Sequence, residues 1–444
     1  PRHYPIRIVF ARERTSRTQV RRGAGSCQTT PQQTPRRRRA LGPPRGTLSA
    51  NDSEALVTDF KDAETAAPLV LDPDALQQLL EKAERSVSEE GLPSVQIALA
   101  YRGEIIAFET FGEATHAALY PIFSATKAMT AALTWLSIQS GDLDIDRPVS
   151  DWIPEFAGGE KSAVRVHHLL THTGGFPNAP FKPTDYWDPD RKRARFKQWR
   201  LDWPPGTAFT YHPSSSFWVL AEILEIIHKQ TFSSMIQDRI AEPLSLTDLW
   251  VGCPEHQQHR IVDISYVGDG PSEADYAARN LSPPPITEVT EEAITRFNTA
   301  ETRQVPIPGG GGYTSAATLA LFYQGLLGFN QNSGHFLKTP WREATLLEAR
   351  RVRTEGLKDP FLGIDVLRGL GIVIAGETNR HLRGFGHLNS PEAFGHNGAG
   401  GQIAWADPET GISFAYLTNG HDRNPFRQGS RGVSLSNKAA VCLK

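Results

Sequence analysis

The stretch 120–138 reads YPIFSATKAMTAALTWLSI and contains Ser124 and Lys127, the only S-x-x-K pair in the chain. The run after the serine is rich in good helix formers, so we expect a helix over 125–138 with Ser124 at its N-terminus. Residues three apart lie on one face of a helix, which lets the amine reach the hydroxyl. A serine needs a base to become a nucleophile, and partial burial favours the neutral amine. The helix N-terminus also favours developing negative charge.

The spacing alone leaves a simpler interpretation open, in which Ser124 caps a core helix and Lys127 is exposed. The common nucleophile elbow, G-x-S-x-G, occurs nowhere in the chain. Its nearest match, GISFA at 411–415, falls inside a predicted strand. The S-x-x-K pair is therefore the candidate for the nucleophile and its base, and further motifs are needed to support it.

The composition is that of an ordinary globular protein. The 444 residues are 39% hydrophobic and 22% charged, enough for two or three domains. No run of about 18 apolar residues occurs, so we expect no membrane-spanning helix. Three scattered cysteines, Cys27, Cys253 and Cys442, are too few for a disulfide framework or a zinc site. They are typical of a reducing compartment, and we expect a cytoplasmic location.

Charge is distributed unevenly along the chain. Residues 1–50 hold twelve arginines and one acidic residue, whereas the other 394 residues hold 35 basic and 48 acidic ones. The acidic body argues against nucleic acid as a partner. We expect residues 1–69, rich in Arg, Pro and Gln, to form a disordered leader. The alternatives for this segment are an organellar transit peptide and a nucleic-acid patch at 36–39.

The remaining chain predicts strands at both ends. A helix capped by Asp72, with Pro73 in its first turn, precedes a hairpin with strands at 95–101 and 104–111. Three further strands and a closing helix are predicted at 369–375, 401–406, 412–418 and 429–442.

Residues between these two ends show helical periods, many Pro and Gly, and few strand signals. The pattern favours an α/β (α+β) fold, in which an antiparallel sheet flanked by helices is formed by both chain ends. We predict one sheet domain from 70–140 and 355–444 and a mostly helical domain at 141–354.

Several further segments accompany the S-x-x-K pair. They are YPIFSATK at 120–127, GDLDIDRPV at 141–149, HLLTHTGGFP at 168–177, PGTAFTY at 205–211, GGGGY at 309–313 and GHNGAGG at 395–401. In this order they resemble the active-site segments of serine β-lactamases, D-alanyl-D-alanine carboxypeptidases and related esterases, over residues 70–442. The resemblance implies the β-lactamase/transpeptidase-like fold and an acyl-enzyme on Ser124.

The resemblance assigns Tyr211 to the family's second motif, whose tyrosine relays protons. It lies 87 residues after Ser124, a separation typical of the class C β-lactamase branch and its esterases. Tyr313 is the rival candidate, and a tyrosine with a structural hydroxyl is the simpler interpretation. The family's Tyr-x-Asn reads YHP at 211–213, and Pro213 cannot donate the side-chain hydrogen bond that binds a substrate amide.

The third motif also departs from the family pattern. Lys-Thr-Gly is replaced by HNG at 396–398, closest to the His-x-Gly form of some carboxypeptidases and esterases. A neutral His396 would bind a substrate carboxylate less firmly than the Lys-Thr pair does, and it can also be a structural histidine. Gly398 lets the strand approach the substrate. The resemblance implies that the N–H groups of Ser124 and Ala399 form the oxyanion hole.

Two other patterns predict neither a metal nor a cofactor. His168 and His172 have zinc-ligand spacing but lack the glutamate of H-E-x-x-H. The glycines at 309–312 lack the Lys-Ser/Thr that completes a phosphate-binding loop. We therefore expect a reaction that needs neither.

These observations predict a serine hydrolase that cleaves short-chain carboxylic esters, with Ser124, Lys127 and Tyr211 as catalytic residues. The altered amide- and carboxylate-binding motifs favour esters. A β-lactamase, a D-alanyl-D-alanine carboxypeptidase, a transacylase and a non-catalytic scaffold with this fold are the alternatives. The expected partner is a small ester, and the sequence does not indicate an oligomeric state.

Overall fold

The computed structural model describes residues 70–279, 281–283, 289–329 and 339–444. Leu71–Lys444 belongs to one compact unit. The predicted leader at 1–69 lies outside the described residues. None of the helices in the described ranges is long and apolar enough to cross a membrane.

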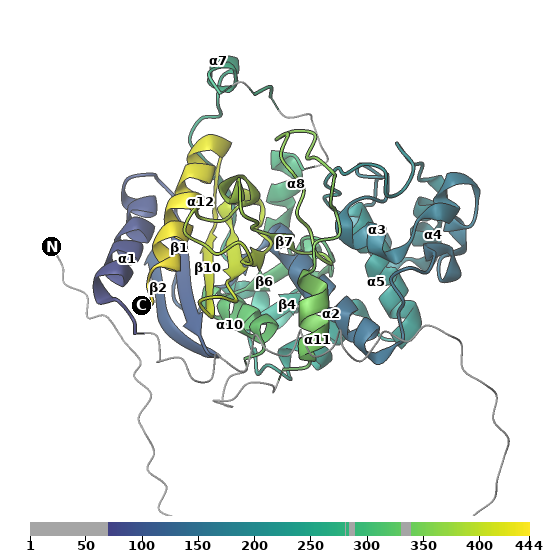
Figure 1. Cartoon of the computed structure of the whole chain (residues 1–444), viewed down its shortest axis with the longest axis horizontal. Coiled ribbons are helices and arrows are strands. Elements are labelled where there is room, and N and C mark those ends of the chain that lie inside the picture. Colours follow the sequence, from purple (N-terminus) through teal and green to yellow (C-terminus); the bar gives the residue numbers. More distant parts are fainter. Residues whose placement is uncertain (1–69, 280, 284–288, 330–338) are drawn as a thin grey trace, which may run out of the picture. The chain divides into compact units, whose positions relative to one another are not determined.

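Figure 1 labels most of the elements. The helices are α1 Pro73–Ser88, α2 Thr126–Ser140, α3 Val166–Thr171, α4 Pro189–Gln198, α5 Ser215–His228, α6 Phe232–Ile236, α7 Glu273–Ala277, α8 Glu291–Thr295, α9 Ala300–Gln304, α10 Ala316–Leu327, α11 Glu343–Arg350 and α12 Pro425–Ala440. The strands are β1 Ser94–Tyr101, β2 Glu104–Gly112, β3 Tyr120–Pro121, β4 Leu249–Val251, β5 Ser265–Val267, β6 Gly312–Thr314, β7 Val373–Ile374, β8 Phe394–Gly395, β9 Ile403–Ala406, β10 Ile412–Thr418 and β11 Gly420–Asp422.

The principal sheet is antiparallel and combines strands from both ends of the described chain (Figure 1). Its order is β2–β1–β10–β9–β8–β7. Strand β1 pairs with β10 so that Val95 lies opposite Thr418 and Tyr101 opposite Ile412. The predicted hairpin β1–β2 is present, and the predicted strands at 401–406 and 412–418 also pair, as β9 and β10. The prediction of an antiparallel sheet formed by both chain ends is therefore confirmed.

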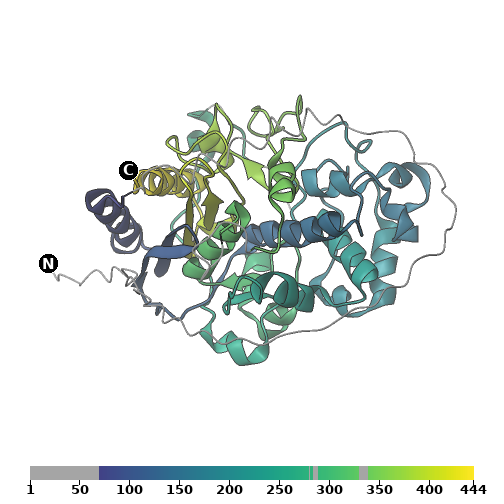
Figure 2. The ribbon, with the colours of Figure 1, turned by 60° about the horizontal axis from the view of Figure 1, so that its bottom comes forward.

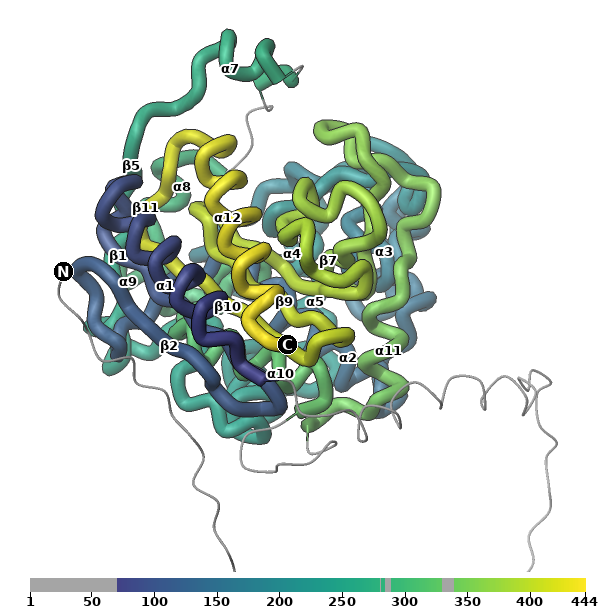
Figure 3. The backbone as a smooth tube through the Cα atoms, turned by 60° about the vertical axis from the view of Figure 1, so that its left-hand side comes forward, coloured from purple at the N-terminus to yellow at the C-terminus, as the bar shows by residue number. Residues whose placement is uncertain are grey.

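Alternate residues of β1 face two different cores, because successive side chains of a strand point to opposite sides. Val95, Ile97 and Leu99 pack with residues of α1 and α12. Ala98 and Ala100 belong instead to the larger core, with residues of α10. Figure 3 shows α1 and α12 side by side along the sheet. The small alanines let α10 lie close to the strands.

Helix α1 begins as its sequence predicts. The Asp72 carboxylate accepts hydrogen bonds from the N–H groups of Asp74 and Ala75, at 3.0 and 3.2 Å. These bonds satisfy donors that a helix start otherwise leaves without partners. The closing helix starts earlier than predicted, at Pro425 rather than 429, because Asn424 caps it in the same way.

The predicted strand at 369–375 is mostly wrong. Only Val373–Ile374 is a strand, β7, and the preceding glycines form a turn. Gly371 has φ +82°, which glycine adopts without strain, and its N–H donates to the Leu170 carbonyl at 3.1 Å. The turn places Arg368 in a bridge opposite Val373. The run GLGIVI is apolar enough for a strand, but its two glycines reverse the chain.

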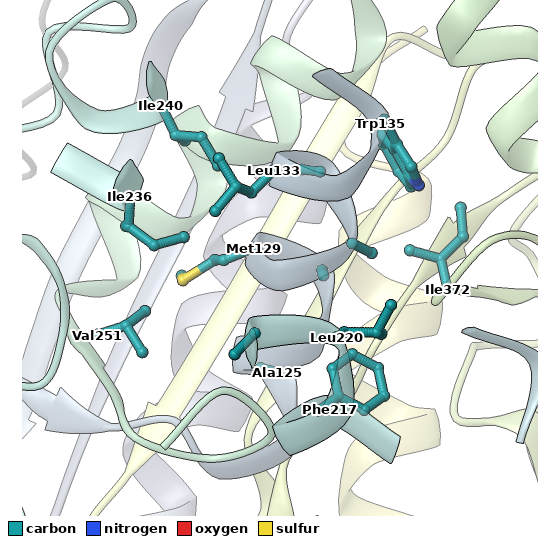
Figure 4. Close-up of a cluster of buried hydrophobic side chains, with 14 of the residues drawn as sticks. Ala125, Met129, Leu133, Trp135, Phe217, Leu220, Ile236, Ile240, Val251 and Ile372 are labelled. Carbon is teal, nitrogen blue, oxygen red and sulfur yellow. The ribbon is translucent and has the colours of Figure 1, made fainter. Parts of the chain in front are cut away.

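Helix α2 is buried on nearly all sides, as Figure 2 shows where this blue helix crosses the middle of the fold. In Figure 4, Met129 and Leu133 of α2 point toward Ile236 and Ile240, which belong to α6 and the helical turn after it. Trp135 points away from these two residues, on the opposite side of α2. The Trp135 indole N–H donates to the Leu370 carbonyl at 2.9 Å. This packing fixes the helix whose N-terminal end carries the S-x-x-K pair.

A small sheet of order β3–β6–β4 lies beside the start of α2. It pairs Pro121 with Tyr313, and the Ile122 N–H donates to the Gly312 carbonyl at 2.9 Å. The glycine-rich loop is thereby placed next to the serine turn. The division into a sheet domain and a helical domain at 141–354 stays a prediction, and α10, which falls in that range, packs on the principal sheet.

Candidate active site

Ser124 lies in a short 3-10 turn, Phe123–Ala125, immediately before α2. Phe123 has φ +45°, an uncommon value for a residue with a side chain, so the nucleophile candidate sits on a tight bend. The Thr126 hydroxyl accepts the Gly312 N–H at 2.8 Å and ties this bend to the glycine-rich loop. The Ser124 side chain stays half-buried and accessible.

Lys127 is fully buried, more completely than the sequence predicts. Its Nζ donates to the carbonyls of Pro213 at 2.6 Å and Gly309 at 2.7 Å, and lies 3.2 Å from Ser124 Oγ. Carbonyl oxygens only accept hydrogen bonds, so two amine hydrogens point at them. A neutral amine held this way turns its lone pair toward the serine hydroxyl. The contacts therefore suit a base that acts on Ser124.

Tyr211 is the second group in contact with the serine. Its hydroxyl donates to Ser124 Oγ at 2.8 Å. Lys127 Nζ lies 5.1 Å from the Tyr211 ring centroid, and the Arg368 guanidinium lies 5.4 Å from it. The ring is thus close to two basic side chains, and a nearby positive charge such as that of Arg368 favours the phenolate of a proton-relaying tyrosine. Tyr313 instead packs in a separate buried cluster with Cys253 and Ile261.

Two histidines hold the segment that carries Tyr211. The His212 N–H donates to His172 Nδ1 at 3.1 Å, and His212 Nε2 accepts the Phe176 N–H at the same distance. Burial lowers the pKa of His212 to about 4, so the ring is neutral at pH 7. His172 is also fully buried, and burial holds its pKa well below the usual value. Both rings position the tyrosine.

The remaining predicted features have structural roles. His168 Nδ1 accepts the Arg165 N–H at 3.0 Å, and His172 lies beyond the end of α3. Within the described ranges, no group of three or more His, Cys, Asp or Glu is arranged to hold a metal ion. The glycine-rich loop supplies the Gly309 carbonyl that accepts from Lys127.

The third motif lies across from the serine turn. His396 is buried, and its ring centroid is 6.0 Å from that of Tyr211. Burial and the charges of Arg368 and Lys127 hold its pKa well below the usual value. Ala399 packs in a cluster with Phe123, the residue before the serine. The structure therefore brings Ser124, Lys127, Tyr211, His396 and Ala399 into one site.

Gly398 is required for a reason that the sequence does not reveal. A Cβ atom there would lie 2.1 Å from the carbonyl oxygen of Ile122. The backbone at Gly398 therefore packs directly against the backbone just before Ser124. If a methyl group is added at position 398, one of these two backbone segments has to move.

We expect Gly398→Ala to lower the free energy of unfolding by about 1–3 kcal/mol, the usual cost of overpacking. Gly310→Ala is the matched control, since a Cβ there meets nothing within 4 Å. Its effect should stay within about 0.5 kcal/mol. Urea unfolding of both variants measures the difference, and equal midpoints would contradict the proposed close approach.

Arg368 is a site residue that sequence reasoning missed. Its guanidinium lies over the rings of Phe209 and Tyr211, and Nη1 is 3.4 Å from His396 Nε2. The residue comes just before the glycine turn that the sequence reads as part of a strand. Neither motif nor spacing marks it, because only the turn brings it beside Tyr211.

Comparison with known proteins extends these observations. Residues 73–435 match the sequence model of the family described as Beta-lactamase. The Beta-lactamase of Yersinia enterocolitica is 25% identical over 194 residues, which cover 42% of this chain and 47% of that protein. The Esterase/beta-lactamase LipL of Mycobacterium tuberculosis (strain ATCC 25618 / H37Rv) is 26% identical over 318 residues, 67% of this chain and 68% of that one. The match to the Yersinia protein thus spans about half of that relative's length.

A solved structure agrees with the fold. The Novel Penicillin-Binding Protein (PBP) Homolog from Caulobacter crescentus superimposes with a TM-score of 0.69 and 28% sequence identity. The match covers 85% of this chain and 100% of that chain. The predicted β-lactamase/transpeptidase-like fold is therefore confirmed.

Proposed function

Because the chain belongs to the beta-lactamase family of serine hydrolases, we propose that it cleaves short-chain carboxylic esters through an acyl-enzyme on Ser124. The observation that carries this proposal is the double contact of Ser124 Oγ, with Lys127 Nζ at 3.2 Å and with the Tyr211 hydroxyl at 2.8 Å. A nucleophile needs one group that removes its proton and one that supplies a proton to the leaving group. Lys127 would remove the proton of the nucleophile, and Tyr211 would supply a proton to the leaving group.

Acylation and deacylation follow from these contacts. Lys127 takes the proton of Ser124 as Oγ attacks the ester carbon, and Tyr211 protonates the alkoxide as the C–O bond breaks. Water then attacks the acyl-enzyme and gives a proton to the Tyr211 phenolate. Lys127 returns the first proton to Ser124 as the acid leaves. Every proton is restored, and the sum is ester plus water to acid plus alcohol.

The oxyanion of each tetrahedral intermediate would be bound by the backbone N–H groups of Ser124 and Ala399. Support comes from the packing of Ala399 against the hydrophobic cluster that contains Phe123, a residue of the serine turn. Such donors act without reorganisation, because both backbones are held before the substrate arrives. Gly398 allows this approach by lacking a Cβ atom next to Ile122.

Two contacts favour esters over amides. Pro213 presents its carbonyl to Lys127 and has no side-chain donor for a substrate amide. The Asn397 side chain is used within the protein, since it donates to the Gly384 carbonyl and accepts the Ala404 N–H. An ester needs no amide recognition and has a better leaving group. The expected cytoplasmic location belongs to this proposal and rests on the sequence alone.

A β-lactam is the second candidate substrate, because the LipL relative is described as both an esterase and a beta-lactamase. We expect kcat/KM for p-nitrophenyl butyrate to exceed that for nitrocefin at least about 100-fold, the discrimination that one unmade hydrogen-bonded contact gives at an active site. A preference for nitrocefin would overturn the ester assignment. A fluorophosphonate probe should label Ser124, and failure to label it would favour a non-catalytic scaffold.

A further inference from the structure

We propose that His421 is a positioning residue for the oxyanion hole, because its ring packs against both segments that carry the N–H donors. The inference rests on the proposed ester hydrolysis and deepens it by adding a residue that no motif marks. His421 acts through its two neighbours, Phe123 and Gly400, and not by contact with the ester.

The two donors proposed for the hole, the N–H groups of Ser124 and Ala399, lie on segments that are far apart in the sequence. Tertiary contacts therefore set the distance between them. Donors bind an oxyanion best at about 2.7–3.1 Å, so a small displacement of either N–H group weakens the hole. Gly398 makes one contact between the two segments, with the Ile122 carbonyl. The side chain of His421 makes another.

The His421 ring lies against a neighbour of each donor. Its centroid is 4.9 Å from that of Phe123, the residue before Ser124, and the two rings meet edge to face at 71°. At Gly400, the residue after Ala399, an added Cβ atom would lie 2.1 Å from the Cδ2 and Nε2 atoms of His421. Gly400 has φ +80°, so glycine suits both its backbone and the space beside it. The imidazole thus contacts the serine turn and the third-motif segment at once.

The strand that carries this ring is fixed on two sides. His421 lies in the middle of β11, which pairs in parallel with β5 and places it opposite Tyr266. The Tyr266 ring centroid lies 5.2 Å from that of His421. Next along the strand, the fully buried side chain of Asp422 accepts a hydrogen bond from Arg431 at 2.8 Å. A ring on a strand held in this way resists displacement, so it limits where its neighbours can lie.

The ring constrains its neighbours by shape and not by charge. Burial lowers the pKa of His421 to about 4, so the imidazole is neutral at pH 7. Its Nε2 atom is buried and has no hydrogen-bond partner among the residues that the structure describes. Van der Waals packing against Gly400 therefore places this edge of the ring. A side chain with the same reach should be able to replace it.

A comparison of an ester with its thionoester tests the hole directly, on the purified full chain. The substrates are p-nitrophenyl butyrate and its thionoester, in which sulfur replaces the carbonyl oxygen. Sulfur is a weak hydrogen-bond acceptor and gains less from the N–H donors. We expect wild type to favour the ester about 100-fold or more in kcat/KM, the range that one oxyanion donor contributes.

His421→Ala should lower kcat for the ester about tenfold or more, with KM changed less than about threefold, because the donors lose their fixed separation. The thionoester depends less on the donors, so the ester-to-thionoester ratio should fall at least about fivefold. His421→Gln should recover most of both values, since its amide reaches about as far as the ring nitrogen Nε2.

Gly400→Ala tests the same contact from the side of the glycine. With His421 in place, the added Cβ atom meets the ring and should shift the third-motif segment, which lowers the same ratio. In the His421→Ala background the space is open, so Gly400→Ala should lower kcat less than it does in wild type. The strain of a positive φ is common to both backgrounds and cancels in this comparison.

His168→Ala is the matched control. Like His421, His168 is a buried histidine whose pKa burial lowers to about 4, and it lies against a glycine of positive φ, Gly206. It has a structural role outside the serine turn and the third motif, so its replacement should lower stability but leave the ester-to-thionoester ratio unchanged. Thermal unfolding shows that each variant is folded.

Three results would overturn the inference. His421→Ala could lower hydrolysis of the ester and of the thionoester equally, as expected if the ring only stabilises the fold. Gly400→Ala could lower kcat equally in both backgrounds, which shows that His421 does not hold Gly400. If His421→Ala does not fold, an unchanged ratio in Gly400→Ala has the same force. A wild type that hydrolyses neither substrate would instead contradict the proposed function itself.

Discussion

Ser124→Ala abolishes ester hydrolysis, with an expected loss in kcat of about 10⁴-fold or more, as for other serine nucleophiles. We expect the variant to keep the fold, because Ser124 is half-buried and its hydroxyl contacts only the side chains of Lys127 and Tyr211 among the described hydrogen bonds. What is lost is the bond-forming atom, so no neighbouring group can replace it. Steady-state hydrolysis of p-nitrophenyl butyrate measures the effect.

Ser140→Ala is the control for this variant. Ser140 is the last residue of the same helix, α2, and is exposed. It should retain the wild-type rate and react with a fluorophosphonate probe, whereas Ser124→Ala should not be labelled. Retention of hydrolysis by Ser124→Ala would exclude the acyl-enzyme mechanism.

Lys127→Gln is expected to lower kcat by about 10²–10⁴-fold, the range that a positioned general base contributes. Glutamine can still donate to one of the two carbonyls that now accept from Nζ, those of Pro213 and Gly309. It has no amine lone pair for the serine proton. The rate of fluorophosphonate labelling should fall in parallel, since that reaction also needs an activated serine.

Lys161→Gln controls for the cost of removing a buried lysine. Lys161 is 9% exposed and, like Lys127, donates to two backbone carbonyls, those of Phe196 and Lys197. It lies outside the site, so its replacement should affect stability but leave kcat near the wild-type value. If both lysine variants lost activity equally, Lys127 would be a structural residue and not a base.

The elements with strong local signals are predictable from the sequence. The cap at Asp72, the hairpin turns and the apolar run of α2 each depend on neighbouring residues, and each matches the structure. The S-x-x-K pair shares this property, because its two residues meet within one helical turn. The segment GLGIVI shows where local reading fails. Its apolar residues predict a strand, whereas contacts with α3 and α11 make a glycine turn.

The sequence by itself determined the fold class and proposed the serine and its lysine, since short-range periodicity and the order of the motifs indicate them. Only the tertiary structure decided what surrounds that pair. Pro213 and Gly309, 86 and 182 residues from Lys127, supply the carbonyls that orient its amine. Arg368 reaches Tyr211 through a turn that no motif marks. These contacts depend on how segments far apart in the sequence pack together, and local sequence patterns do not indicate which distant residues come close in the fold.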